Sequence, residues 1–568
     1  MSRAPTRRLA ATFACLAAAA GVARAAPVAV RWFADRPIAW QEHDDADVPV
    51  APEANHLQVL ETALTIRDSV AGEADRILSL EGPTAALDVN AIDEVPCSTW
   101  FCARNHLRAM PLDEIAAGAV GPPPRLPLTI TKGKELGAAS GFQVKDADGH
   151  KYMLKFDVTG HLGMANAGEM IGSRIFHAAG YNVPAATSLD LRPEDLRVSP
   201  SATYLVYRVQ KRPLTEALVR PALAGVATGP DGRIRAVAVS WIPGTILGGF
   251  DMMGVRPGDP NDRIPHQHRR SVRASRVLFA WLSVLDPSSI NTIDSWVEQD
   301  GRRFVRHYFF DFGCAFGSAT NYMQGIQQDG EYLVEVGRTL AALFSFGLYR
   351  RPFQDQRDEW NRLVAEHPAL GYPAESFDPD AFRGNRKLPS HMRLTERDAY
   401  WGAKLVTAFS DAQIAALVAT ARLGDADARY LEHGLRVRRD IIGRRYLRAV
   451  AAVESPVVAP GGGKLCFHDL AIARGYAPAV EVRYQVSVSD GAGKQLAGFE
   501  QPASGPDACV PIGDVAPDAS GYRVVEIRSR FIGPAGHEGL HVGKPARVHL
   551  RWRETERAFA VVGLERDE

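Results

Sequence analysis

Residues 302–313 read RRFVRHYFFDFG and join a strand pattern to a carboxylate. The apolar run favours a β-strand, and Asp311-Phe312-Gly313 follows it directly, before the irregular segment CAFGSATN. A carboxylate at the end of a strand can bind a divalent metal that bridges nucleotide phosphates, and a glycine lets the chain turn away sharply. Asp311 is therefore a candidate metal ligand.

Two further polar groups stand upstream in the segment DPSSIN, where Asp286 precedes Asn291 by five residues. The apolar pattern of residues 269–285 predicts a helix that delivers this segment onto a loop. There a carboxylate can orient an acceptor hydroxyl, and an amide oxygen can hold a second metal ion. The alternative is a solvated loop capped by two common turn residues, and the downstream Asp311 favours the functional interpretation. Asp294 is a nearby rival for either position.

A lysine and a glutamate complete the candidate set. Lys155 ends the strand-like run YMLK between apolar neighbours, and a buried lysine needs a partner. Glu169 can provide one, because it lies on the helix predicted over residues 165–179, which Gly180 is placed to end. Together they would hold the α and β phosphates of a nucleotide. The alternative is a surface ion pair, the usual fate of these residue types.

Backbone groups in two places could also contact a nucleotide. Gly133, Gly137 and Gly141 lie in KGKELGAASGF between two predicted strands, where glycines let amides approach phosphates; the alternative is a plain hairpin turn. Trp241 and Ile242 lie in SWIPG, a strand end that could act as a hinge and bind an adenine edge, or could be an ordinary strand end.

Composition and the first residues predict an exported globular protein. The 568 residues are 46% apolar and 23% charged, typical of three or four globular domains, and the equal numbers of basic and acidic residues, 66 each, favour no nucleic acid partner. Arginines at the start, an apolar run of 14 and Ala23-Arg24-Ala25 predict a signal peptide over residues 1–25. A lipoprotein site at Cys15 and twin-arginine export are weaker alternatives. Cleavage would remove four arginines and leave 62 basic against 66 acidic residues.

Five cysteines would remain after cleavage. In an oxidising compartment the expected pairs are Cys97 with Cys102 and Cys466 with Cys509, which leaves Cys314 over. The alternative is that all five stay reduced. No later segment reaches about 18 uninterrupted apolar residues, so we expect no transmembrane helix in the mature chain.

The hydrophobic pattern elsewhere predicts how the chain is divided into segments. Residues 26–56 resemble an extended leader, residues 56–80 have helical spacing, and GPPPRLP (121–127) is a stiff linker. Strands are expected around 125–158 and in ATYLVYRVQ, IRAVAVSWIPG and a hairpin turning at Asp300-Gly301. Residues 331–450 predict helices, the last with many arginines on what we expect to be a solvated face. Alternating runs near 455–560 predict a small β-sandwich, and no internal repeat is present.

The order Lys155, Glu169, a hinge at 240–244, Asp286 with Asn291, and Asp311-Phe312-Gly313 resembles the protein-kinase-like fold. It is closer to the atypical branches, such as phosphoinositide, HipA-type and secretory-pathway kinases, than to ordinary protein kinases. The phrases DEVPCSTWF, MLKFD, FHAAGYNVP, DPNDRIPHQHRR and RDAYWGAK also resemble an uncharacterised exported bacterial family with this core. The resemblance covers about residues 90–450.

The resemblance implies an α+β, bilobal fold with a C-terminal β-sandwich. Its expected parts are an N-terminal extension at 26–105, an N-lobe with hinge at 106–244, a helical C-lobe at 245–454 and the sandwich at 455–568. It implies ATP with Mg²⁺ or Mn²⁺ as cofactors. Lys155 and Glu169 carry over as the phosphate clamp, Asp286 as the catalytic base, and Asn291 with Asp311 as metal ligands.

The sequence departs from the kinase pattern in three places. Val284-Leu285, not His-Arg, precedes Asp286; 20 residues separate Asn291 from Asp311; and no Ala-Pro-Glu segment follows. The support of the catalytic loop must therefore differ, and the sequence does not predict regulation through a phosphorylated activation loop.

The expected activity is transfer of a phosphoryl group from ATP to an unidentified protein or small-molecule hydroxyl, outside the cytoplasm in the periplasm or beyond. Two alternatives are nucleotidyl transfer and a secreted pseudokinase that binds a partner without chemistry. His266-Gln267-His268 could ligate a metal, and GDPNDR (258–263) could meet substrate, but solvated, capping or turn roles suffice for both.

Overall fold

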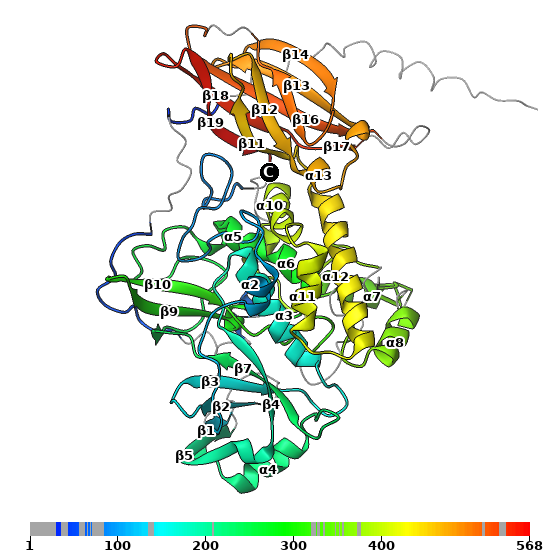
Figure 1. Ribbon diagram of the computed structural model, residues 1–568. Coiled ribbons are helices and arrows are strands. Elements are labelled where there is room, and N and C mark those ends of the chain that lie inside the picture. Colours follow the sequence, from blue (N-terminus) through cyan, green and yellow to red (C-terminus); the bar gives the residue numbers. More distant parts are fainter. Residues whose placement is uncertain are drawn as a thin grey trace, which may run out of the picture.

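The computed structural model describes most of the chain after the first 29 residues. The described residues are 30–35, 44–55, 63–64, 66–68, 70, 84–133, 141–206, 210–319, 325, 330–332, 335–346, 348–351, 353–354, 357–371, 376–513, 517–532 and 541–568. The expected signal peptide, Gly137 and most of the expected helix at 56–80 lie outside them. The chain has a mixed α/β fold with several sheets (Figure 1).

A seven-stranded sheet, in the order β4-β7-β3-β2-β1-β5-β6, begins the main body. Its strands are β1 Leu128–Gly133, β2 Gly141–Lys145, β3 Lys151–Phe156, β4 Ala186–Leu191, β5 Leu196–Val206, β6 Gln210–Pro213 and β7 Ile234–Ser240. Alternation along β3 places Leu154 and Phe156 in a core that α4 (Glu216–Ala224) covers through Val219. The opposite face of the sheet meets α3 (Met164–Ala179), where Met170 packs on β7.

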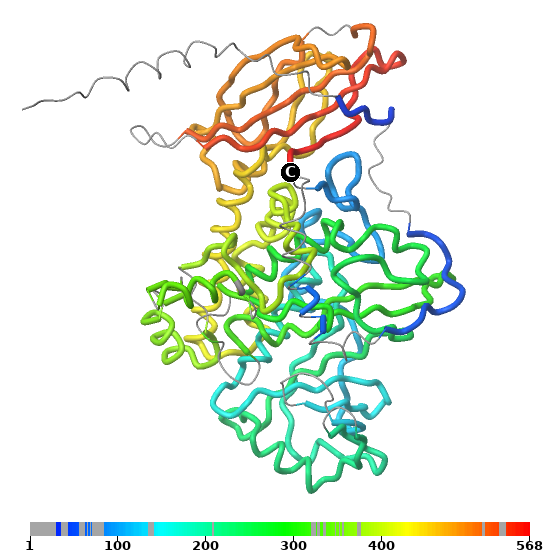
Figure 2. Tube along the Cα trace, turned by 180° about the vertical axis from the view of Figure 1, so that it is seen from behind, coloured from blue at the N-terminus to red at the C-terminus, as the bar shows by residue number. Residues whose placement is uncertain are grey.

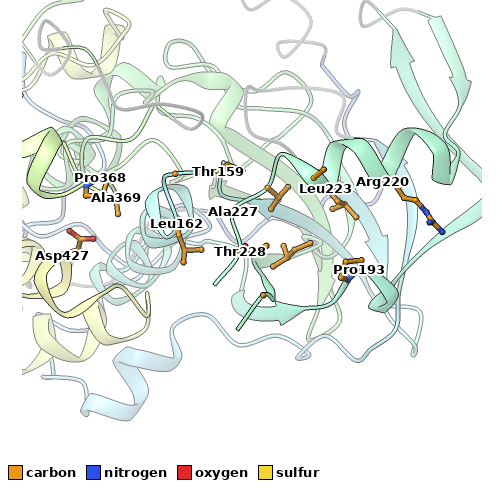
Figure 3. A pocket seen from close by; sticks show the side chains of 15 residues that line it. Thr159, Leu162, Pro193, Arg220, Leu223, Ala227, Thr228, Pro368, Ala369 and Asp427 are labelled. Atoms are coloured by element: carbon orange, nitrogen blue, oxygen red, sulfur yellow. The ribbon is translucent and has the colours of Figure 1, made fainter. Parts of the chain in front are cut away.

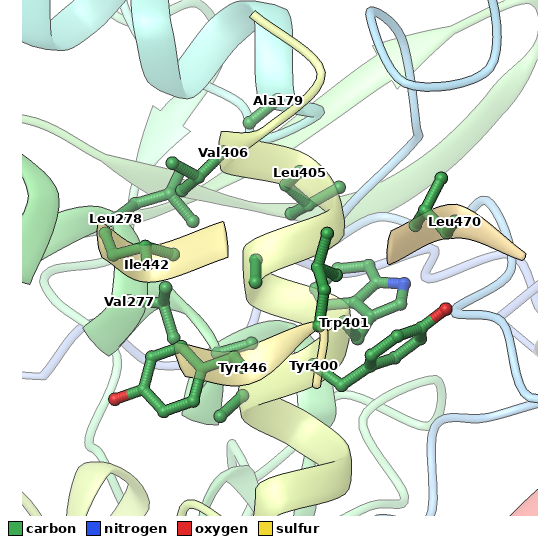
Figure 4. Packing of buried hydrophobic residues seen from close by; sticks show 14 of the residues in the cluster. Ala179, Val277, Leu278, Tyr400, Trp401, Leu405, Val406, Ile442, Tyr446 and Leu470 are labelled. Atoms are coloured by element: carbon green, nitrogen blue, oxygen red, sulfur yellow. The ribbon is translucent and has the colours of Figure 1, made fainter. Parts of the chain in front are cut away.

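The helical part follows the sheet in the chain, except for α2, which precedes β1. Its helices are α2 Leu112–Ala117, α5 Arg270–Arg273, α6 Ser275–Leu282, α7 Val336–Phe344, α8 Arg357–Glu366, α9 Pro389–Met392, α10 Glu396–Val406, α11 Asp411–Ala419 and α12 Asp425–Tyr446. The core between α6, α10 and α12 is built from large apolar side chains, including Trp401, Leu405 and Ile442 (Figure 4). No helix in the described ranges is both long and apolar enough to cross a membrane.

The expected helix at 269–285 is wrong in its continuity and its end. It divides at Ala274 into α5 and α6, and the Ser275 hydroxyl donates a 2.7 Å hydrogen bond to the carbonyl of Val272, which competes with the regular helical ladder. The second helix ends at Leu282, because Ser283 adopts a left-handed conformation with φ of 49°.

The expected hairpin is present as β9 (Thr292–Gln299) and β10 (Arg302–Phe309), to which the short strand β8 (Thr245–Ile246) adds. Asp300 and Gly301 both have positive φ, as the tight turn requires. This hairpin carries the chain from Asn291 to Asp311, and its two ends therefore lie side by side.

Two further sheets form the C-terminal part, which lies at the opposite end of the molecule from the seven-stranded sheet in both views (Figure 2). Their strands are β11 Val453–Val458, β12 Lys464–Asp469, β13 Val482–Asp490, β14 Gln495–Pro502, β15 Asp507–Pro511, β16 Tyr522–Phe531, β17 His541–Val542, β18 Ala546–Arg553 and β19 Ala558–Arg566, with the short helix α13 Leu470–Ala473. Phe467 of β12 packs against Tyr484 of β13, so the two sheets share apolar contacts.

Both expected disulfides are formed. Cys97 is bonded to Cys102, and Cys466 is bonded to Cys509, its register partner across β12 and β15. Cys314 takes part in neither bond.

Candidate functional site

Three of the five key residues predicted from sequence are in direct contact. The five key residues are Lys155, Glu169, Asp286, Asn291 and Asp311. The Lys155 ammonium donates to Glu169 Oε2 at 2.7 Å and to Asp311 Oδ1 at 2.8 Å. The lysine and glutamate side chains are buried, at 8% and 1% exposed, whereas Asp311 is 28% exposed. The cluster therefore has an inner, water-excluded pair and one carboxylate that faces solvent.

The two carboxylates keep Lys155 charged. Burial alone would lower the pKa of the lysine, but attraction to Asp311 and Glu169 outweighs burial and raises that pKa well above its usual value. A permanent cation at the end of β3 is suited to steadying phosphate oxygens.

The start of α3 is fixed by Asp157, two residues after Lys155. Its buried carboxylate accepts hydrogen bonds from the backbone N–H groups of Gly163, Ala165 and Asn166, and from the Asn166 amide. Burial raises the pKa of Asp157, and these hydrogen bonds act in the opposite direction. Because one carboxylate ties β3 to the first turn of α3, the positions of Lys155 and Glu169 are set together.

Two glycines on α3 admit the segment that carries Asp311. A Cβ atom added at Gly168 would lie 2.5 Å from the carbonyl oxygen of Phe312, and one at Gly172 would lie 2.7 Å from the Phe312 side chain. This close approach lets the Phe312 N–H donate to Glu169 Oε2 at 3.1 Å. Asp311 itself has a φ of 63°, a sharp turn two residues after the end of β10.

Replacing Gly168 by alanine is therefore expected to push the Phe312 backbone away from α3. The free energy of unfolding should fall by about 1–3 kcal/mol, the usual effect of overpacking. Gly337, on α7 with open space around its Cα, is the matched control, and its alanine variant should be neutral or up to about 1 kcal/mol more stable. Urea denaturation of both variants measures the difference; equal stability would contradict the close packing.

Asp286 and Asn291 form a second group, which a backbone hydrogen bond links to the segment that carries Asp311. The Asn291 amide donates to Asp286 Oδ2 at 3.0 Å and to its carbonyl oxygen at 2.7 Å. The carbonyl of Asn291 accepts from the N–H of Phe310, the residue before Asp311, at 3.1 Å. Asp286 also accepts a 2.9 Å hydrogen bond from Arg386, a residue that the sequence patterns did not mark. The structure thus brings all five key residues into one connected region.

The donor atoms of this region suit a hard divalent cation. Because the Asn291 nitrogen donates to Asp286, the amide oxygen is left as an acceptor. The Asn291 backbone is hydrogen-bonded to Phe310, the residue before the partly exposed Asp311. Glu169 Oε1 is buried and has no hydrogen-bond partner among the described residues. Carboxylate and amide oxygens are the ligands that Mg²⁺ and Mn²⁺ prefer.

The described residues whose backbone was predicted to contact a nucleotide lie on strands of the seven-stranded sheet or just after its last strand, β7. Gly141 pairs with Lys155 across β2 and β3, while a Cβ atom at Gly133 would lie 2.9 Å from Tyr204, so that glycine accommodates a neighbouring strand. The Trp241 side chain is 41% exposed and Ile242 is buried. Their contact with a nucleotide stays a prediction.

The weaker candidates from the sequence, Asp294 and His266, are hydrogen-bonded to other side chains. Asp294 is fully buried between Arg256, at 2.7 Å, and His307, at 2.7 Å, and does not join the site. His266 contacts Asp262 of the 258–263 loop at 2.6 Å. This contact gives His266 and the polar loop partners within the protein.

A cavity of about 750 Å³ is surrounded by a different set of residues (Figure 3). It is lined by the loop after β3, including Thr159 and Leu162, by Leu223 at the end of α4, and by Pro368 and Asp427 of the helical part. None of the five key residues lines it. We therefore place the candidate chemistry at the contacts of Lys155 and Asp311, not in this cavity.

No protein-family model and no curated protein matches the chain. Among solved structures, the chain is similar to a Helicobacter pylori proinflammatory kinase, CtkA, with 11% identity and a TM-score of 0.27 over 55% of this chain and 94% of that one. It is also similar to two structures of a Golgi casein kinase, one with Mn/ADP bound, at 10% and 8% identity and TM-scores of 0.28 and 0.26, over 72% of this chain and 94% of theirs. Similarity at this level leaves the chemistry to be argued from the side chains.

Proposed function

We propose that the protein is an exported, kinase-like phosphotransferase that moves a phosphoryl group from ATP to a hydroxyl acceptor. The observation that carries the proposal is the connected set in which Lys155 lies between Glu169 and Asp311, and Asp286 is joined to Asn291 one hydrogen bond away from the Asp311 segment. A buried cation, partly exposed oxygen ligands and an oriented carboxylate are the parts that phosphoryl transfer needs.

Each residue has a distinct role in this proposal. Asp311 and the Asn291 amide oxygen would hold Mg²⁺ or Mn²⁺, which supplies charge stabilisation to the phosphates when bound. Lys155, kept in place by Glu169, steadies the α and β phosphates. Asp286, 23% exposed, accepts a hydrogen bond from the acceptor hydroxyl and orients its oxygen toward the phosphorus atom.

The proposal also includes the division of the chain. The nucleotide would lie between an N-lobe at 106–244 and a helical C-lobe at 245–454, with Trp241 and Ile242 at the hinge. Residues 455–568 would form an accessory β-sandwich. Two disulfides fit a protein that works outside the cytoplasm, after removal of residues 1–25.

The first test is nucleotide binding. ATP with Mn²⁺ at about 100 times its dissociation constant should add about 2.7 kcal/mol to stability and raise the melting temperature by a few degrees. Asp311→Asn should remove that shift, because it removes a charged metal ligand, whereas Asp148→Asn in the exposed β2–β3 turn should keep it. An unchanged melting curve of the wild type with saturating ATP would favour a pseudokinase without nucleotide.

The second test follows the transferred group. The mature protein is incubated with periplasmic extract and ATP labelled either at the γ or at the α phosphate. We expect label in the products only from γ-labelled ATP. Label from α-labelled ATP would instead show nucleotidyl transfer at the same site.

A further inference from the structure

We propose that Arg386 is the positioning residue of Asp286, supplied from a segment 100 residues further along the chain. This inference rests on the proposed function, because it concerns the residue that would orient the acceptor hydroxyl. It identifies what replaces the missing His-Arg pair before Asp286.

The carboxylate of Asp286 is held from two sides. Arg386 donates to Oδ1 at 2.9 Å, and the Asn291 amide donates to Oδ2 at 3.0 Å. Both donors approach a side chain that is still 23% exposed. The carboxylate plane is thus fixed while part of the group remains open to an acceptor.

The segment that carries Arg386 docks directly on the catalytic loop. The N–H of Asn385 donates to the carbonyl of Leu285 at 2.7 Å. Gly384 packs on Pro287 so closely that an added Cβ would lie 2.7 Å from the proline ring. The two backbones therefore run in contact on both sides of Asp286, and the position of one sets the position of the other.

Buried residues anchor this segment at both ends. Phe382 and Leu388 are 3% and 1% exposed and belong to the main core. The side chain of Arg276, from α6, also donates to the carbonyl of Phe382 at 3.0 Å. Arg386 itself is buried, with a side chain 8% exposed, so its guanidinium has little freedom to leave Asp286.

An arginine suits this position for a physical reason. Its guanidinium is planar and always charged, so it fixes the direction of a carboxylate that accepts its hydrogen bond. Because an acceptor hydroxyl must meet both Asp286 and the phosphorus atom, a small rotation of the carboxylate should reduce transfer and leave nucleotide contacts at Lys155 and Asp311 intact.

The experiment compares the wild type with Arg386→Ala, Arg386→Lys and the control Arg383→Ala. Arg383 lies on the same segment, but its side chain donates to the backbone carbonyls of Asp380 and Phe382 and not to Asp286. The readouts are transfer of the γ-phosphoryl group to a mixed serine, threonine and tyrosine peptide library, the melting temperature, and the shift of that temperature with ATP and Mn²⁺. Transfer by the alanine variant is also measured with added guanidinium ion.

We expect Arg386→Ala to lower kcat by about 10–100-fold with an unchanged nucleotide shift, Arg386→Lys to lose less, and added guanidinium to restore part of the rate. Arg383→Ala should match the wild type. If the wild type transfers phosphoryl groups and Arg386→Ala transfers equally well, the inference is wrong and the proposed function stands. Loss of the nucleotide shift together with the rate, without rescue by guanidinium, would show a merely structural role. A wild type that transfers nothing would overturn the proposed function itself, and the role of Arg386 with it.

Discussion

Replacing Asp286 by asparagine is expected to lower phosphoryl transfer by about 10³-fold while the stabilisation by ATP and Mn²⁺ stays unchanged. Asparagine has nearly the same shape and retains an oxygen that can accept from Arg386. It loses the acceptor for the Asn291 amide at Oδ2, but that amide can still donate to the backbone carbonyl of residue 286, so the loop should keep its fold. It lacks the negative charge that draws the proton of the acceptor hydroxyl. The nucleotide is contacted by other residues, which explains why binding should survive.

The measurement pairs initial rates of γ-phosphoryl transfer with thermal shifts. Asp411→Asn provides the control, because Asp411 is an exposed carboxylate at the start of α11 in the same helical part. Unchanged transfer by the Asp286 variant would remove that residue from its proposed role. Loss of transfer and of the nucleotide shift together would move Asp286 into the metal site.

Local sequence patterns predicted the parts of the site that depend on neighbours in the chain. The strand that carries Lys155, the helix that carries Glu169 and the hairpin before Asp311 all follow from alternation, helical spacing and turn residues. Their order along the chain then indicated which side chains should meet. The contact of Lys155 with both carboxylates agrees with that expectation.

Contacts between distant segments could not be predicted in this way. Arg386 lies in GNRKLP, where nothing in the local pattern marks it as a partner of Asp286. The arginine-rich helix α12 shows the same difficulty, because its expected solvated face holds only in part. Arg438 is 1% exposed, lies over the ring of Phe377 and donates to backbone carbonyls at the end of α6. Whether an arginine is solvated or buried depends on which segments pack on the helix, and spacing along one helix does not contain that information.

The second large effect is expected at Asp93, whose carboxylate joins four separate parts of the chain. It is buried and accepts from Arg270 of α5 at 2.8 Å, from Arg397 of α10 at 2.8 Å, and from Arg566 of β19. Replacing Asp93 by alanine leaves three buried guanidinium groups without this shared partner. We expect the free energy of unfolding to fall by roughly 3–5 kcal/mol, as when one member of a buried ion pair is removed.

The Asp93 carboxylate should also make the free energy of unfolding depend on pH. Burial would raise the pKa of Asp93, but the three arginines outweigh burial and hold that pKa well below its usual value. The folded state therefore binds a proton less readily than the unfolded state, whose aspartate pKa is about 3.9. The stabilisation is fully present above about pH 4 and is lost as the pH falls toward the folded-state pKa.

Urea denaturation of the wild type, Asp93→Ala and Asp93→Asn between about pH 7 and pH 3 tests the loss of stability and its dependence on pH. The gap in stability between the wild type and Asp93→Asn should stay largest above about pH 4. It should narrow below that pH, because acid protonates the carboxylate of the unfolded wild-type chain while the folded chain keeps its charge. Asp148→Ala is the control, because Asp148 pairs with Arg125 on the surface and such pairs add little. A gap that stays constant with pH would mean that packing, and not the charge of Asp93, joins the N-terminal segment to the helical part and the C-terminal sheets.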